Sequence, residues 1–155
     1  MFQPVYSQDN HLPAARSSSL GRLGEAAAAR YLERRGYRLV LANFKAPVGR
    51  NRLGVSVTGE IDLLALDGDV LCFTEVKTKS SAEFSAPLTA VDLRKQRQII
   101  RTARVYRRIF GLHDVKYRYD VVSIVREKNG RPRIEHFPNF WNESKFRKKY
   151  RDDYF

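Results

Sequence analysis

The stretch GEIDLLALDGDVLCFTEVK, residues 59–77, has the pattern of two apolar β-strands joined by a tight turn at an Asp-Gly pair. Four charged residues interrupt the apolar pattern near its two ends: Glu60, Asp62, Glu75 and Lys77. A strand pair buried in a core has little use for such residues, because burying a charge is costly. Whether these four charges lie together on one face of the hairpin therefore decides whether they form a functional site.

The turn fixes which residues of the hairpin share a face. A two-residue turn at positions 67 and 68 sets Asp62 opposite Phe73. The same counting sets Glu60 opposite Glu75. Opposed residues of an antiparallel pair lie on the same side of the sheet, so all four charges are predicted on one face, remote from the turn. The other face is nearly all apolar, which predicts a hairpin covered on both sides.

This face carries three carboxylates and one lysine. An exposed Glu75–Lys77 pair would contribute only ~0–1 kcal/mol, and one lysine does not neutralise three acids. Crowded, partly buried carboxylates either take up protons or bind a cation, and oxygen ligands favour Mg²⁺ or Mn²⁺. Zinc is disfavoured, because the histidines and the single cysteine are scattered along the chain: His11, Cys72, His113 and His136. The alternative is a structural cluster of ion pairs.

Composition limits the class of protein. The 155 residues suit one domain, and 29 Lys and Arg against 17 Asp and Glu give a formal net charge of +12. Such an excess favours polyanionic partners, nucleic acid first, over the bland alternative of general solubility. We expect no membrane partner, because no stretch is apolar enough to span a bilayer or to form an interfacial helix. The lone Cys72 excludes an internal disulfide and, with no secretory signal pattern, suits the cytoplasm.

Hydrophobic periodicity predicts the remaining elements. A helix from Ser19 to a terminating Gly36 precedes a strand at 37–44 and a basic loop at 46–54. A second helix covers 88–110, followed by a strand at 117–125, a turn at Asn129-Gly130 and a short strand at 132–137. Residues 1–17 form a loosely ordered lead-in, 18–141 the domain and 142–155 a basic, aromatic tail. The apolar side of the first helix is predicted to consist of Leu20, Leu23, Ala27 and Tyr31.

An acid in GEID followed by EVK one strand later resembles the PD-(D/E)XK signature of restriction-endonuclease-like nucleases. Four ordered blocks resemble the YraN family more closely, and that family is similar to archaeal Holliday-junction resolvases. The blocks are GRLGEAAAARYLERRGYRLVLANF, GEIDLLALDGDVLCFTEVKTKS, AVDLRKQRQIIRTARVY and YRYDVVSIV, within residues 20 to about 140. The resemblance implies an α/β fold with an αβββαβ core, in which helices flank a mixed central sheet.

The resemblance also implies roles for individual residues. Asp62, Glu75 and the carbonyl of Val76 would hold the metal, and Lys77 would orient or help to deprotonate the attacking water. Glu25 would support the site from the first helix; the alternative is an exposed acid paired with a nearby arginine. Glu60 has no implied role. The sequence departs from the pattern in two ways: Ile61 replaces the proline of the signature, and residues 45–58 resemble an insertion.

The second helix has two different faces. Lys95 lies in line with Val91 and Ile99 on the apolar stripe, so it either extends past the core to solvent or reaches the acidic end of the hairpin, with Gln96 in a weaker supporting role. The opposite side carries an arginine stripe without interleaved acids, which favours phosphate contact over a merely solvated face. The stripe consists of Arg94, Arg97, Arg101, Arg104 and Arg108. Arg50 and Arg52 of the basic loop are predicted to extend it.

These observations favour a metal-dependent endonuclease acting on DNA rather than RNA, with branched or junction DNA among its candidate substrates. Junction resolution would require two active sites and hence a homodimer, although no residue identifies an interface. The main alternative is a non-catalytic nucleic-acid-binding module on the same fold. A third interpretation is a basic scaffold that binds RNA or the ribosome. Phe137, Phe140 and Trp141 are expected to pack the last strand rather than stack on bases.

Overall fold

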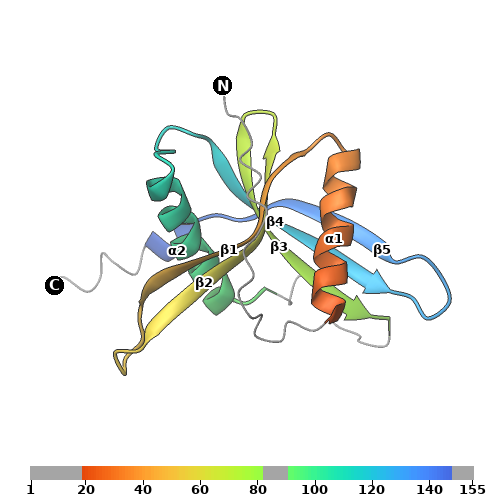
Figure 1. Ribbon diagram of the computed structural model, residues 1–155, viewed down its shortest axis with the longest axis horizontal. Coiled ribbons are helices and arrows are strands. Elements are labelled where there is room, and N and C mark those ends of the chain that lie inside the picture. Colours follow the sequence, from red (N-terminus) through yellow and green to blue (C-terminus); the bar gives the residue numbers. More distant parts are fainter. Residues whose placement is uncertain (1–18, 82–90, 148–155) are drawn as a thin grey trace.

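The computed structural model describes residues 19–81 and 91–147, which form a five-stranded mixed sheet flanked by helices (Figure 1). The elements are α1 (Ser19–Arg34), β1 (Arg38–Arg50), β2 (Ser56–Asp67), β3 (Val70–Ser80), α2 (Leu93–Ile109), β4 (Tyr117–Arg126), β5 (Arg133–Trp141) and α3 (Ser144–Arg147). The predicted α/β class and element order are confirmed. The predicted lead-in, the tail beyond 147 and Leu88 lie outside the described residues. The predicted helix at 88–110 is corrected to 93–109, because the side chain of Asp92 caps the helix by accepting from the backbone N–H of Lys95.

The strands lie in sequence order, and only β3 and β4 run parallel, with α2 as their crossover. On one face, Ile99, Ala103 and Tyr106 of α2 pack on Leu64 and Phe73 of the sheet. On the other face, a smaller cluster joins α1 to the sheet through Ala28, Leu32, Leu63, Val122 and Ile124. The hairpin is therefore covered on both sides, as predicted. No helix within 19–81 or 91–147 is long and apolar enough to cross a membrane.

The prediction for the buried side of α1 was right for two residues and wrong for two. Ala27 and Tyr31 are half-buried and pack against the core cluster beneath the helix. The residues that face the sheet are Gly24, Ala28 and Leu32, whereas Leu20 and Leu23 are 46% and 65% exposed. The helix seats its strip of small residues on the sheet because close approach requires it. A Cβ on Gly24 would collide with the hydroxyl of Thr78 on β3. Backbone proximity at Gly24 and burial of Ala28 and Leu32 together select this face.

The prediction of a basic loop at residues 46–54 was also wrong for most of its length. β1 continues through residues 46–50 and pairs with β2 as far as Arg50 and Ser56, so only 51–55 connect the strands. Pro47 and Gly49 are tolerated because β1 is an edge strand with an irregularity between these two residues. The stretch at 45–58 therefore lengthens a hairpin.

The β2–β3 register differs from the prediction by two residues. Asp67 pairs with Val70, and Leu64 pairs with Phe73, so the two turn residues are Gly68 and Asp69. Gly68 adopts a φ of 59°, a left-handed conformation that glycine accepts without steric cost. A shift of two leaves every side chain on its predicted face, whereas a shift of one would have reversed them all.

The last strand is longer than the predicted 132–137, because aromatic packing extends it to Trp141. Trp141 is buried and stacks on Tyr119 at a centroid distance of 5.2 Å. Phe137 and Phe140 pack against the same core. The expectation that these three rings pack the strand is confirmed.

Gly59 sets how closely the β1–β2 hairpin approaches α2. A Cβ at this position would collide with the buried hydroxyl of Thr102, and it would lie 2.9 Å from Cγ1 of Val48. We expect Gly59→Ala to lower the free energy of unfolding by ~1–3 kcal/mol, as overpacking does. Urea denaturation measures this change. Gly130→Ala is the matched control, because its nearest neighbour is 3.8 Å away; an equal loss in both variants would contradict the steric explanation.

Candidate active site

The predicted charges lie where β2 and β3 separate. The pairing of these strands ends at Leu63 and Thr74. Asp62, just before Leu63, and Glu75, just after Thr74, are the first residues beyond it. Figure 1 shows the strands diverging from there, β2 with β1 beneath α2 and β3 with β4 toward α1. We call this region the fork. It brings together two carboxylates that the sequence separates by a whole hairpin.

Asp62 is a buried acid, with 9% of its surface exposed. Its Oδ2 accepts a hydrogen bond of 2.8 Å from the backbone N–H of Val76. Burial, and then the negative charge of Glu75, raise the pKa of Asp62 to about 7. The Val76 N–H and the charge of Lys95 act in the opposite direction but do not restore the ordinary value. Near neutral pH this carboxyl is therefore poised between its protonated and ionised forms.

Glu75 lies next to Asp62 and is only 3% exposed. Its Oε1 lies 3.2 Å from Nζ of Lys77 and 3.6 Å from Nζ of Lys95. Its Oε2 is buried and has no hydrogen-bond partner within the described part of the chain. Lys95 thus reaches the acidic end of the hairpin, which was one of its two predicted placements. The neighbouring Gln96 is buried and donates to the carbonyl of Val91.

Glu25 approaches the same acids from α1. Burial and the charge of Asp62 are the two largest causes that raise the pKa of Glu25, while a hydrogen bond with Asn43 lowers it. None of the ion pairs of the described residues joins Glu25 to an arginine, so the alternative of an exposed helix ion pair finds no support. Glu60 lies further out and pairs with Lys45 at 3.8 Å.

Asn43 and Lys45 were not identified from the sequence. Asn43 sits on β1 with a φ of 54°, a left-handed conformation that asparagine adopts more readily than most residues. A lone asparagine in the apolar run LVLANF was the only available signal, and it indicates an irregular backbone rather than a site. Nothing in the pattern of Lys45 distinguishes it from other surface lysines.

The acids and lysines at the fork are closer to equal in number than the sequence indicated. Four acids (Glu25, Glu60, Asp62 and Glu75) face three lysines (Lys45, Lys77 and Lys95), instead of three acids facing one lysine. Two of those lysines contact the same oxygen, so the compensation is uneven. The partnerless Oε2 of Glu75 and the raised pKa of Asp62 fit a hard cation held between the two carboxylates. In the described residues no three Asp, Glu, His or Cys side chains are grouped to hold a metal, so such a cation would need further oxygen ligands.

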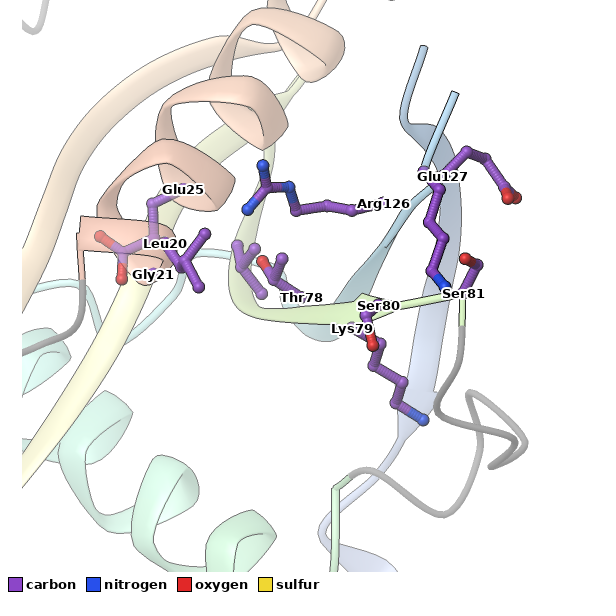
Figure 2. A pocket seen from close by; sticks show the side chains of 11 residues that line it. Leu20, Gly21, Glu25, Thr78, Lys79, Ser80, Ser81, Arg126 and Glu127 are labelled. Carbon is purple, nitrogen blue, oxygen red and sulfur yellow. The ribbon is translucent and has the colours of Figure 1, made fainter. Parts of the chain in front are cut away.

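A pocket of roughly 540 Å³ opens beside the fork, between the start of α1 and the far ends of β3 and β4 (Figure 2). Glu25 and Val76 line it on the side of the fork. Figure 2 shows the side chain of Arg126 reaching from β4 toward α1. The remaining lining includes two further cations and three hydroxyls: Lys79, Lys128, Thr78, Ser80 and Ser81.

The arginine stripe of α2 is exposed along its whole length, as predicted. Two of its members also have structural contacts. Arg104 donates from Nη2 to Oε2 of the buried Glu143 at 3.0 Å, and Arg97 lies 5.5 Å from the ring centroid of Phe146. Arg50 and Arg52, which were predicted to extend the stripe from a loop, are exposed at the end of the β1–β2 hairpin.

Comparison with known proteins places this arrangement in a family. Residues 24–124 match the family described as "Uncharacterised protein family UPF0102". A UPF0102 protein of Chlorobium limicola is 39% identical over 132 residues, covering 81% of this chain and 95% of the relative. A relative from Geobacter sulfurreducens is 41% identical over 120 residues, covering 77% and 86% of the two chains. The chain therefore belongs to UPF0102, the restriction-endonuclease-like YraN family.

Proposed function

We propose that this member of the UPF0102 family is a nuclease that hydrolyses phosphodiester bonds in DNA and depends on Mg²⁺ or Mn²⁺. The observation that carries the proposal is the pair of buried carboxylates at the fork, one with a raised pKa and the other with a partnerless oxygen. The two lysines contact only one oxygen of Glu75, and the neighbouring Asp62 has no ion pair among the described residues, so the negative charge of the pair is incompletely compensated. Ionised carboxylates kept close together without full compensation are typical of sites that bind a cation.

The residues of the fork divide into distinct roles under this proposal. Asp62, Glu75 and the carbonyl of Val76 would hold the cation, which supplies a Lewis acid for the phosphate and lowers the pKa of a water. Lys77 and Lys95 meet on one oxygen of Glu75 and bring two positive charges toward the reacting phosphate. Lys77 would orient the attacking water, and Lys95 would stabilise the negative charge of the transition state.

Glu25 and the pocket extend the site beyond the reacting bond. The pocket opens next to Glu25 and Val76, so a phosphate beside the cleaved bond could enter it. Arg126, Lys128 and the hydroxyl of Ser80 offer the charge and donors that a phosphate needs. Glu25 would hold a water or the cation from the side of α1.

A cleavage assay tests the proposal. Linear, nicked, flapped and four-way DNA, with single-stranded RNA as a further substrate, are incubated with Mg²⁺, Mn²⁺ or chelator. We expect cleavage of at least one DNA substrate with either metal and none with chelator. Absence of cleavage under all conditions, from protein that binds the same DNA, would favour the alternative function.

That alternative is a non-catalytic module that binds nucleic acid. It is favoured by the two lysines on Glu75, which already neutralise much of its charge, and by the absence, among the described residues, of three acids grouped closely enough to hold a metal. The arginine stripe would serve both functions equally.

The stripe itself predicts how binding depends on salt. Changing Arg94, Arg101 and Arg108 to Gln should weaken DNA binding at least about tenfold. The slope of log affinity against log salt concentration should become less steep by about 2–3, because each phosphate contact releases counterions. Arg104 is spared, since its loss would leave the buried Glu143 without this partner. Salt titrations by fluorescence anisotropy measure the effect, without divalent metal.

The matched control removes the same charge elsewhere, by changing the exposed Arg30, Arg34 and Arg38 to Gln. If both triple variants lose equal affinity, only net charge matters and the stripe is not the contact surface.

A further inference from the structure

The end of the β1–β2 hairpin, residues 47–58, projects from the body of the protein (Figure 1). We call it the arm. The described fold gives its tip an unusual surface: Leu53 is 87% exposed and Val55 is 58% exposed. Arg50 and Arg52, also exposed, lie beside them, and the arm contains no acid. An apolar tip with two adjacent cations is therefore presented to solvent.

Hydrogen bonds fix the tip in this shape. The side-chain oxygen of Asn51 accepts from the backbone N–H of Leu53 at 2.9 Å and of Val55 at 3.0 Å. The backbone of Asn51 bonds to Val55 and Gly54, each at 2.9 Å. Nη1 of Arg50 donates to the carbonyl of Gly54 at 2.7 Å. Gly54 has a φ of 76°, which closes the turn at low steric cost. The exposure of Leu53 is thus a property of an ordered turn.

The root of the arm is held on α2, beside the arginine stripe. Gln98 of α2 donates to the carbonyl of Thr58 at 3.1 Å, and Gly59 allows the close approach of Thr102. Arg94 and Arg101 lie four residues before and three residues after Gln98, which places them on the same side of the helix. A polyanion that follows the stripe therefore meets the arm.

The chemistry of the tip selects among partners. A stable protein interface buries more than about 1,000 Å², which two apolar residues at a hairpin end do not supply. An interfacial membrane contact requires a wide apolar face. A DNA duplex needs only one apolar side chain to separate a base step from the minor groove, with cations on the adjoining phosphates.

We propose that the arm is a minor-groove wedge, in which Leu53 inserts at a base step of duplex DNA while Arg50 and Arg52 contact the flanking phosphates. The proposal rests on DNA being the substrate of the proposed nuclease and adds a second point of contact. From Asp62 to Ser56 the strand covers about 20 Å at ~3.3 Å per residue. Leu53 lies beyond Ser56, so the opened step would lie more than about six base pairs from the cleaved bond where the DNA follows the arm, at the ~3.4 Å spacing of DNA.

The test uses chelator, so that it is independent of cleavage. Duplexes of about 30 base pairs carry the fluorescent base analogue 2-aminopurine at successive positions, and the parent should increase its fluorescence within one narrow window. Leu53→Ser should abolish that increase and weaken binding about five- to tenfold, with an unchanged salt slope because no cation is lost. The matched control is Leu23→Ser, an exposed leucine on α1 that should behave as the parent does.

Arginine variants test the phosphate contacts of the wedge separately from the insertion of Leu53. Changing Arg50 and Arg52 together to Gln should lower the salt slope by about 2. Arg52→Gln alone should lower it by about 1 while keeping the bond between Arg50 and Gly54. A Leu53→Ser variant with parental affinity and fluorescence would overturn the wedge and leave the proposed nuclease intact. A parent that binds no duplex DNA would overturn both.

Discussion

Asp62→Asn, Glu75→Gln and Lys77→Ala are each expected to lower metal-dependent DNA cleavage by about 10³-fold or more. The first two changes remove a carboxylate charge from the fork while nearly preserving shape. In Asp62→Asn the amide oxygen would still accept from the Val76 N–H, so a folding defect is not the expected cause. Removing Lys77 takes away the ammonium group 3.2 Å from Glu75 that would position the water. Cleavage rates under single-turnover conditions measure the effect.

Two controls lie near the turn at the other end of this hairpin, one on the turn and one just before β4. Asp69 and Lys116 form an exposed ion pair near the β2–β3 turn, so Asp69→Asn and Lys116→Ala should cleave at the parental rate. DNA binding in chelator should survive in all five variants, because the arginine stripe is untouched. If the three fork variants cleave as fast as the two controls, after separation from contaminating nucleases, the assignment of the site fails.

Lys95 allows a graded comparison. It contacts the same oxygen of Glu75 as Lys77 does, but from a different element, and the family resemblance assigns no water-orienting role to it. Under the proposed division of roles, Lys95→Ala should retain more cleavage than Lys77→Ala.

The sequence predicted the face of the fork residues better than their exact partners. Alternation along a strand depends only on parity, so an error of two residues in the register left Asp62 and Glu75 on the same side. The turn was misplaced because Asp67-Gly68 and Gly68-Asp69 are both good two-residue turns, and cross-strand packing decided between them. The separation of the strands beyond Leu63 and Thr74 has no local signal, because it follows from two helices packing on opposite faces.

The two largest errors of prediction have the same physical origin. The prediction for α1 placed Leu20 and Leu23 on its buried side, whereas Gly24 is the buried residue of that turn because the backbone approaches Thr78 there. The prediction of a loop at 46–54 relied on Pro47 and Gly49, which weaken a strand in the middle of a sheet but not at its edge. Both errors come from tertiary context that a local pattern does not contain.

Asp62→Asn is also expected to stabilise the metal-free protein at pH 8, by on the order of a few kcal/mol. The pKa of Asp62 is raised to about 7 in the folded state, above the ordinary 3.8. The folded state therefore holds a proton that the unfolded state releases, so the parent loses stability as the pH rises from about 4 to about 7. A neutral asparagine side chain does not ionise, so the variant does not lose stability in this way as the pH rises. Thermal melting in chelator at pH 5 and pH 8 should show the advantage of the variant growing with pH, while Asp69→Asn follows the parent.

Added metal reverses the order of stability, and this reversal separates a cation site from a structural cluster. Mg²⁺ or Mn²⁺ that binds only the folded state raises the melting temperature of the parent, since binding shifts unfolding by mass action. Asp62→Asn lacks one charged ligand and should respond weakly or not at all. A structural network predicts the opposite pattern: loss of Asp62 destabilises the protein at pH 8 in chelator, and the parent is indifferent to both ions. That pattern would remove the basis for a cation at the fork, and the charges of residues 59–77 would then serve the fold alone.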